Sequence, residues 1–212
     1  MRTGARFIAA FVLLSPLWAL AGELTVLIDD GHGHRVADAV VTMRSSDPGR
    51  AIASHSAVSR TIDQRDLAFV PYIEVFQPGD AVVFRNSDRT RHHVYSFSPA
   101  KQFEFVLAPG ESSKPQRLEK TGVVAVGCNI HDQMIAYLFV SDAPWVARSG
   151  RDGRVDFKGL PPGAYVVDVW QPRMRPGRSP KSLTAVVADA GSRTLAWSLS
   201  LSPPTDYDNS GY

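Results

Sequence analysis

Short apolar runs separated by polar turns make up most of the chain. The runs are rich in β-branched or aromatic side chains, and Gly, Pro, Asp, Asn and Ser cluster between them, as expected of β-strands and their connections. No window keeps a helical period for three turns. The sequence therefore predicts an all-β protein built of sandwiches or barrels. Its expected strands lie at 24–28, 39–43, 72–75, 81–84, 94–97, 123–126, 135–140, 165–170 and 183–187.

Residues 1–21 have the pattern of a secretory signal peptide. Arg2 and Arg6 give a positive start, an apolar run follows at 7–17, and residues 19–21 form a small-x-small cleavage site. The run is too short to span a bilayer, and no later stretch reaches the ~20 apolar residues of a membrane helix. We therefore expect an exported protein, periplasmic or otherwise outside the cytoplasm. It would be soluble after cleavage, with no membrane span in the mature chain; a retained N-terminal anchor is the alternative.

Charge and motif content exclude several classes of function. Removal of the predicted signal peptide takes away two of 23 basic residues and none of the 21 acidic ones. A nucleic-acid partner is not expected, because such chains normally carry a basic excess on one face. The sequence has no Ser-His-Asp order, glycine-rich phosphate loop or carboxylate pair that would suggest catalysis. We therefore expect a protein that is not an enzyme.

The most informative chemistry lies on one predicted loop. Cys128 is the single cysteine and ends a predicted strand, and His131 and Met134 follow it at spacings of three and six residues. A lone cysteine in an exported protein indicates an intermolecular bridge, a reactive thiol or a metal ligand. Copper favours thiolate and imidazole donors in one plane, with a weak thioether on the axis. The loop carries three donors of these types.

A fourth donor has to come from another strand. The predicted strand 81–84 is followed by a turn and then by His92 and His93, at the start of the next strand. Because side chains alternate along a strand, only one of the two histidines should point at the metal.

These motifs resemble those of the cupredoxins, the small blue copper proteins. The Pro-Gly-Asp turn at 78–80, the strand to Phe84, and Asn86 with a histidine six residues later are similar to plastocyanin. The Cys-x-x-His-x-x-Met spacing looks like that of amicyanin. The resemblance covers roughly residues 60–142, and its Asn-x5-His element favours His92 as the first ligand. It implies a Greek-key cupredoxin β-sandwich.

The resemblance also implies a ligand set. His92, Cys128 and His131 would be equatorial ligands of one type 1 copper ion, and Met134 would be the axial ligand. Two positions depart from the family pattern. His93 stands where an asparagine or similar residue usually braces the ligand loops, and valines replace aromatic residues on the strand before the cysteine.

The function expected from this resemblance is one-electron transfer outside the cytoplasm. A ligand set that suits both copper oxidation states keeps rearrangement small, and His131 on a surface loop would place the metal near a partner. That partner would be a redox protein such as a cytochrome or a dehydrogenase. Copper storage, delivery or sensing without electron transfer is the alternative, and a structural sandwich with a vestigial site is a third hypothesis.

The outer segments resemble a different family, the carboxypeptidase-regulatory-like (transthyretin-like) β-sandwiches. Residues 24–43 look like the opening of such a module, and residues 147–170 look like its closing half. Neither piece has enough strands to bury a core alone. Joined, they would give an ordinary small sandwich.

We therefore expect a cupredoxin inserted in the middle of a second sandwich. Insertion is plausible because domain termini often lie close together at the surface. The alternative is a tandem order, in which the first strands extend the cupredoxin sheets. The predicted divisions are a signal peptide, a first half-sandwich, the copper domain, a second half-sandwich and a disordered tail, at 1–21, 22–55, 56–142, 143–201 and 202–212.

Two further clusters have simpler interpretations than a binding site. One contains possible metal ligands, which we interpret as a hairpin turn with permissive glycines. Its members are Asp29, Asp30, His32 and His34. The other is a basic loop, which we interpret as solvated rather than as a docking patch for an acidic partner. It contains Arg173, Arg175, Arg178 and Lys181.

Overall fold

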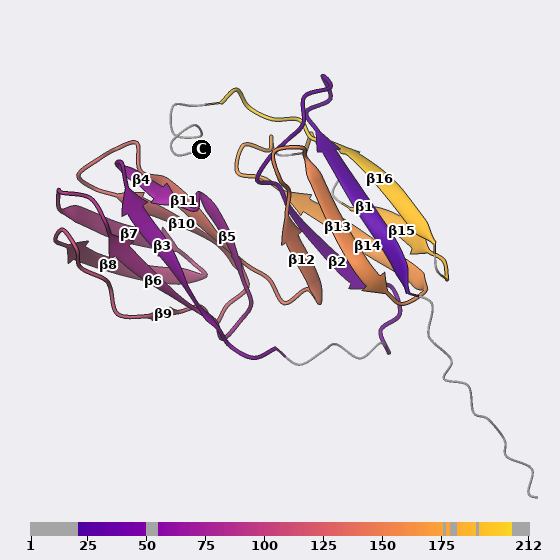
Figure 1. The fold of residues 1–212 in the computed structure, drawn as a ribbon, viewed down its shortest axis with the longest axis horizontal. Coiled ribbons are helices and arrows are strands. Elements are labelled where there is room, and N and C mark those ends of the chain that lie inside the picture. Colours follow the sequence, from indigo (N-terminus) through magenta and orange to yellow (C-terminus); the bar gives the residue numbers. More distant parts are fainter. Residues whose placement is uncertain (1–20, 50–54, 176, 179–181, 190, 205–212) are drawn as a thin grey trace, which may run out of the picture.

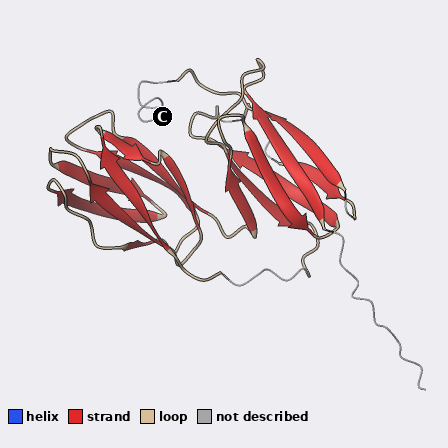
Figure 2. Ribbon diagram, in the orientation of Figure 1, coloured by secondary structure: helices blue, strands red, loops and turns tan. Residues whose placement is uncertain are grey.

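The protein is all-β, as predicted. The computed structural model of the chain describes residues 21–49, 55–175, 177–178, 182–189 and 191–204. Within them are sixteen strands and no helix (Figure 2), and accordingly none that is long and apolar enough to cross a membrane. The predicted signal peptide, apart from its last residue, and most of the predicted C-terminal tail lie outside the described residues.

The strands form two β-sandwiches, drawn on the left and the right of Figure 1. The middle sandwich consists of β3 to β11, with sheet orders β5-β11-β10-β7-β8 and β4-β3-β6-β9. Its strands are Ser59–Arg65 (β3), Ala68–Val70 (β4), Ile73–Phe76 (β5), Ala81–Asn86 (β6), His92–Ser98 (β7), Lys101–Leu107 (β8), Gln116–Arg117 (β9), Gly122–Cys128 (β10) and Ile135–Val140 (β11).

Alternating side chains of these strands fill one core between the two sheets. β10 buries Val124, Val126 and Cys128 on one face, because successive side chains of a strand point to opposite sides. Val82 and Phe84 of β6 meet them from the other sheet. Burial of each such apolar side chain contributes roughly 1.5–3 kcal/mol to the stability of the fold. Since Cys128 continues the buried row of β10, its thiol lies at the end of this core.

The second sandwich joins the two ends of the chain. β1 lies between β13 and β16, and β2 lies between β12 and β14. Its strands are Gly22–Asp29 (β1), Val40–Ser45 (β2), Trp145–Arg148 (β12), Arg154–Leu160 (β13), Gly163–Trp170 (β14), Leu183–Val187 (β15) and Ser192–Ser198 (β16).

This pairing bears on the division into domains. Buried side chains from 24–43 and from 155–199 belong to one core cluster, and neither β1 nor β2 pairs with a strand of the middle sandwich. We therefore propose that residues 56–142 are a domain inserted in the second sandwich, and not one member of a tandem pair. The kinship of the second sandwich to the carboxypeptidase-regulatory-like modules stays a prediction.

Aromatic side chains join the two sandwiches. The ring of Trp170, at the end of β14, lies 5.7 Å from that of Tyr137 and 5.2 Å from that of Phe139, both on β11. Tyr72 packs edge-on against Tyr137 at 5.6 Å. β11 therefore lies between the core of the middle sandwich and the second sandwich, which supports the strand that follows the predicted metal loop.

Candidate metal centre

Three donor atoms converge at one end of the middle sandwich. The Nδ1 atoms of His92 and His131 lie 3.2 Å apart, and each lies 3.7 Å from Sγ of Cys128. His92 and Cys128 are buried, and His131 is half-buried. Across the described part of the chain, this is the one group of three or more His, Cys, Asp or Glu side chains close enough together to hold a metal ion.

Backbone hydrogen bonds fix the loop that carries two of these donors. The N–H of Cys128 donates to the carbonyl of Met134 at 3.2 Å, and the N–H of Met134 donates to the carbonyl of His131 at 3.0 Å. The N–H of Asn129 donates to the carbonyl of His93 on β7 at 3.0 Å. The loop is therefore closed on itself and tied to the strand that carries the other histidine.

Met134 is the last residue of this loop. Its side chain is buried in the same cluster as Cys128 and Val126. A thiolate, two imidazoles and a thioether form the donor set that copper accepts in both of its oxidation states. The residues present therefore fit a copper ion, which would be held by His92, Cys128 and His131 with Met134 as a weak fourth donor. Bound there, copper would supply one-electron redox chemistry.

The two adjacent histidines face opposite sides of β7. His92 is fully buried, with Nδ1 toward Cys128, whereas His93 is half-buried. The Nε2 atom of His93 lies 2.8 Å from a carboxylate oxygen of Glu104 on β8. This geometry favours the register in which His92 is the ligand. His93 instead stands beside the metal loop, with Nδ1 3.5 Å from the side-chain amide of Asn129.

A carboxylate that the sequence analysis missed lies behind His92. Nε2 of His92 is 2.9 Å from Oδ2 of Asp88, so a proton on Nε2 leaves Nδ1 free to bind a metal. The side chain of buried Asn86 holds the same turn. Its Oδ1 atom accepts a hydrogen bond from the Asp88 N–H, and its Nδ2 group donates to the backbone carbonyls of Thr90 and Leu107. A carboxylate four residues before a candidate ligand was the available signal.

The cluster after β1 is a turn rather than a site. The carboxylate of Asp30 accepts hydrogen bonds from the N–H groups of His32 and His34 and pairs with the His34 ring at 2.8 Å. Chiefly because of that ring, the pKa of Asp30 falls to about 2. Gly31 and Gly33 have φ values of 76° and 92°, so permissive backbone is used as predicted. The segment folds back as a short hairpin turn: Asp29 pairs antiparallel with Arg35, and the Val36 N–H donates to the carbonyl of Ile28 at 3.0 Å. After this turn the chain crosses to the other sheet, which contains β2.

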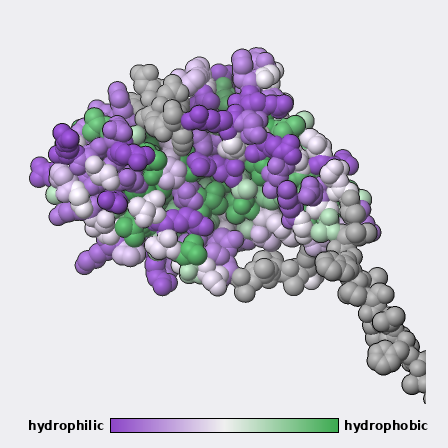
Figure 3. All heavy atoms as spheres, viewed as in Figure 1, coloured by the Kyte–Doolittle hydropathy of each residue, from purple (hydrophilic) through white to green (hydrophobic). Residues whose placement is uncertain are grey.

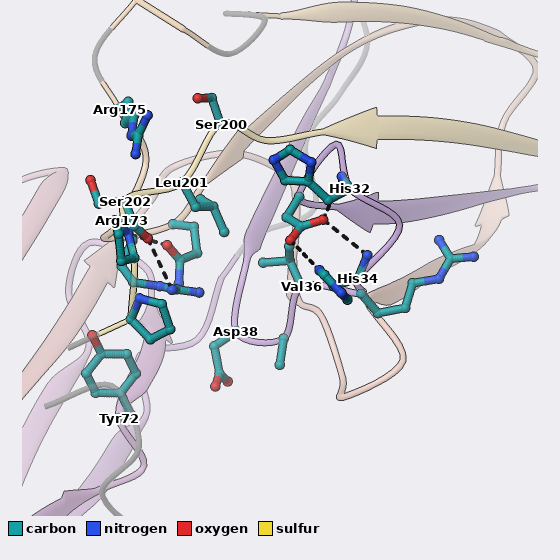
Figure 4. Close-up of a pocket in the computed structure, with 16 residues that line it drawn as sticks. His32, His34, Val36, Asp38, Tyr72, Arg173, Arg175, Ser200, Leu201 and Ser202 are labelled. Carbon is teal, nitrogen blue, oxygen red and sulfur yellow. Dashed lines mark hydrogen bonds and ion pairs between the residues drawn. The ribbon is translucent and has the colours of Figure 1, made fainter. Parts of the chain in front are cut away.

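The same turn lines a pocket of about 620 Å³. Figure 4 shows His32 and His34 on one side of it and Arg173 and Arg175 on the other. The Arg173 guanidinium donates to the carbonyl of Ser202 at 3.2 Å, so part of the predicted basic loop is held by the chain itself. Lys181 lies outside the described residues.

The middle sandwich has a cupredoxin fold. Two mixed sheets enclose one core, the cysteine ends one central strand of the five-stranded sheet, and the first histidine opens the strand beside it. The three donors thus come from two neighbouring strand ends and the loop between β10 and β11.

Comparisons with known proteins find similar solved structures. No protein-family model matches the sequence, and no curated protein matches it. The chain is similar to the Cu-containing nitrite reductase of Thermus scotoductus SA-01, with 21% identity and a TM-score of 0.37, over 47% of this chain and 25% of that chain. It is similar to a purple cupredoxin of Nitrosopumilus maritimus, with 20% identity and a TM-score of 0.35, over 38% and 98%. Amicyanin of Paracoccus versutus has 12% identity and a TM-score of 0.36, over 47% and 98%.

Proposed function

We propose that this protein is a type 1 copper protein that carries single electrons between redox partners outside the cytoplasm. The observation that supports this function most strongly is the convergence of Nδ1 of His92, Nδ1 of His131 and Sγ of Cys128 within 3.7 Å of one another. These donors, with the Met134 thioether, suit both oxidation states of copper. An exported location is the expectation from the sequence of residues 1–21.

The rigidity of the site favours electron transfer. His92 and Cys128 sit on paired strands of one sheet, and the loop to Met134 is closed by its own backbone hydrogen bonds. Functional groups held on strands and locked by supporting contacts move little. Small movement between two oxidation states is what an electron carrier requires.

Access to the site lies at the loop. His131 is the least buried of the three donors, and its neighbour Ile130 is 49% exposed. The face seen in the space-filling view is largely hydrophilic, with small hydrophobic patches (Figure 3). A redox protein that docked over the loop would come close to the metal through His131. A cytochrome or a dehydrogenase is the class of partner we propose.

Electrochemistry of the copper-loaded chain tests this function. We expect a reversible one-electron wave, together with broadening of proton NMR signals when oxidised and reduced protein are mixed, since a carrier exchanges electrons rapidly. Cys128→Ser is the control and should lose both signals. Irreversible reduction with release of copper, or quantitative passage of Cu(I) to an apo-acceptor without electron exchange, would contradict the carrier role and support copper delivery.

A further inference from the structure

The turn between β3 and β4 has an unusual backbone. Asp66 and Leu67 have φ values of 56° and 57°, the left-handed region that residues other than glycine rarely adopt. The two residues form the whole loop of the β3–β4 hairpin, in which Arg65 pairs with Ala68, and a two-residue turn of this type requires a positive φ at both positions. Leu67 is also 48% exposed, so burial does not hold its side chain.

The turn aims both of its N–H groups at one carboxylate. The Asp66 N–H donates to Oδ1 of Asp88 at 2.7 Å, and the Leu67 N–H donates to Oδ2 at 3.2 Å. The same Oδ2 atom lies 2.9 Å from Nε2 of His92. The Asp88 side chain is 11% exposed and that of His92 is fully buried. A continuous set of hydrogen bonds therefore runs from a surface turn of one sheet to the candidate ligand on the other.

We propose that Asp88, held by the Asp66-Leu67 turn, is a positioning residue for the metal centre. Its carboxylate keeps a proton on Nε2 of His92, so Nδ1 presents its lone pair beside Cys128. Its negative charge, close to the site and shielded from solvent, favours the more positive oxidation state of a bound metal. Carboxylate partners of metal-binding histidines act in this way in many metal sites. The inference rests on the proposed copper function for its effect on potential, but not for its effect on the tautomer.

The neighbouring residue offers a matched control. His93 pairs with Glu104 at 2.8 Å, nearly the same distance as in the Asp88–His92 pair, but its ring faces the other side of β7. Removal of either carboxylate deletes one negative charge that faces a histidine of β7. The Glu104 side chain is 57% exposed and that of Asp88 is 11% exposed. Glu104→Gln therefore reports the effect of losing a solvent-screened charge, and a larger effect in Asp88→Asn comes from the buried contact with His92.

The first test compares the reduction potentials of Asp88→Asn and Glu104→Gln. For Asp88→Asn we expect the affinity for Cu(II) to fall at least tenfold relative to that for Cu(I), which corresponds to a rise of about 59 mV for one electron. For Glu104→Gln we expect a much smaller change. Equal shifts in the two variants, or no shift in Asp88→Asn, would overturn the proposal.

The second test needs neither copper nor a mutation of the turn. Nitrogen-15 NMR of the metal-free full chain reports which ring nitrogen of His92 carries the proton. We expect Nε2 to carry it, and a mixture of tautomers in Asp88→Ala. A proton on Nδ1 in the unmodified chain would overturn the role of Asp88 whether or not copper binds. A protein that bound no copper but showed the expected tautomer would instead contradict the proposed function alone.

The contribution of the turn can be tested separately. Insertion of one glycine between Asp66 and Leu67 displaces both N–H groups from Asp88, and we expect it to raise the potential in the same direction as Asp88→Asn. Leu67→Gly keeps both N–H groups and accepts the positive φ, so it should leave the potential unchanged. An unchanged potential in the insertion variant would show that the turn does not position Asp88.

Discussion

Two regions of this molecule bring histidines and carboxylates together, and they do so for different ends. In the turn after β1, the carboxylate of Asp30 is occupied by hydrogen bonds to the N–H groups and the ring of its own turn. At the end of the middle sandwich, the donors of His92, Cys128 and His131 point at one another, and the surrounding hydrogen bonds come from other groups. Both regions contain residue types that bind metals, but only the second leaves donor atoms converging.

The difference lies in where the residues come from. The turn is local, so short-range hydrogen bonds to the carboxylates of Asp29 and Asp30 hold its backbone. The donors of the metal centre come from two strand ends that are 36 residues apart in sequence. Sheet pairing and burial then hold them in place while their donor atoms stay unused. Spacing in the sequence can suggest such a site, but only the fold makes it.

The largest effect is expected when the histidines on the two faces of β7 are replaced one at a time. His92→Gly should lower copper affinity by more than ~100-fold, since even outer-shell changes cost roughly 10–100-fold. His93→Gly should leave a blue site, because the His93 ring faces Glu104. Parallel copper titrations of the two variants check this. Loss of the site in the His93 variant alone would show that the register is off by one residue.

A buried carboxylate of the middle sandwich gives the next largest effect. Asp80 accepts from the N–H groups of Val58 and Gln77 and pairs with His55 and Arg60. Burial by itself would raise the pKa of Asp80, but the backbone N–H groups and His55 outweigh it, and the pKa lies below its usual value. We expect Asp80→Asn to lose about 3 kcal/mol of stability near pH 7, since breaking a buried pair costs that much.

The lowered pKa of Asp80 fixes the sign of the pH dependence. Its stabilisation is fully present above the unfolded-state value of about 3.9 and is lost as the pH falls through the lower folded-state value. Denaturant unfolding across pH 2–7 checks this. The unmodified protein should lose stability toward acid more steeply than Asp80→Asn, and parallel curves would contradict the assignment.

Met134 should tune the site without building it. We expect Met134→Leu to bind copper still, because Cys128 and the two histidines remain, and to show a potential higher by about 60 mV or more, equivalent to a tenfold change in relative affinity. Leucine is close in volume, so the buried cluster should stay packed. Voltammetry of the loaded variant measures the shift. A folded variant without copper affinity would contradict the axial role.

The smallest effect is expected in the turn after β1. The double variant His32→Ala, His34→Ala should bind the same amount of copper as the unmodified chain, because the His34 ring pairs with Asp30 and His32 contacts Asp30 only through its backbone N–H. The pKa of Asp30 should rise from about 2 toward its ordinary value of about 3.9, since its largest partner is gone. Metal analysis and carboxyl NMR titration check the two outcomes. A lower copper content would point to a second site.

Much of the fold could be predicted because its strands are apolar runs. β3 could not be found in this way, since only Ile62 and Gln64 of its seven residues are buried. Its place is determined by parallel pairing with β6, which no local pattern reveals. β8 was within reach: Phe103, Phe105 and Leu107 alternate with polar or exposed residues, and a stricter search for a period of two would have found the strand.

The metal loop could be proposed from sequence because its spacing is local. The choice between His92 and His93 needed the alternation of a strand, which the structure displays through the Glu104 contact of His93. Asp88 stands four residues before His92, so its carboxylate could have been considered from the sequence. The turn that holds Asp88 could not be inferred, because the N–H groups of Asp66 and Leu67 approach from another sheet.

In the function proposed here, Cys128 binds copper as a thiolate beside two histidines. The most direct test is to load the protein with Cu(II) and to record its visible and EPR spectra together with those of Cys128→Ser. We predict one copper per chain and an intense thiolate-to-copper charge-transfer band, which is the signature of a type 1 centre, with the band absent in the serine variant. A spectrum that is the same in both proteins would contradict the account.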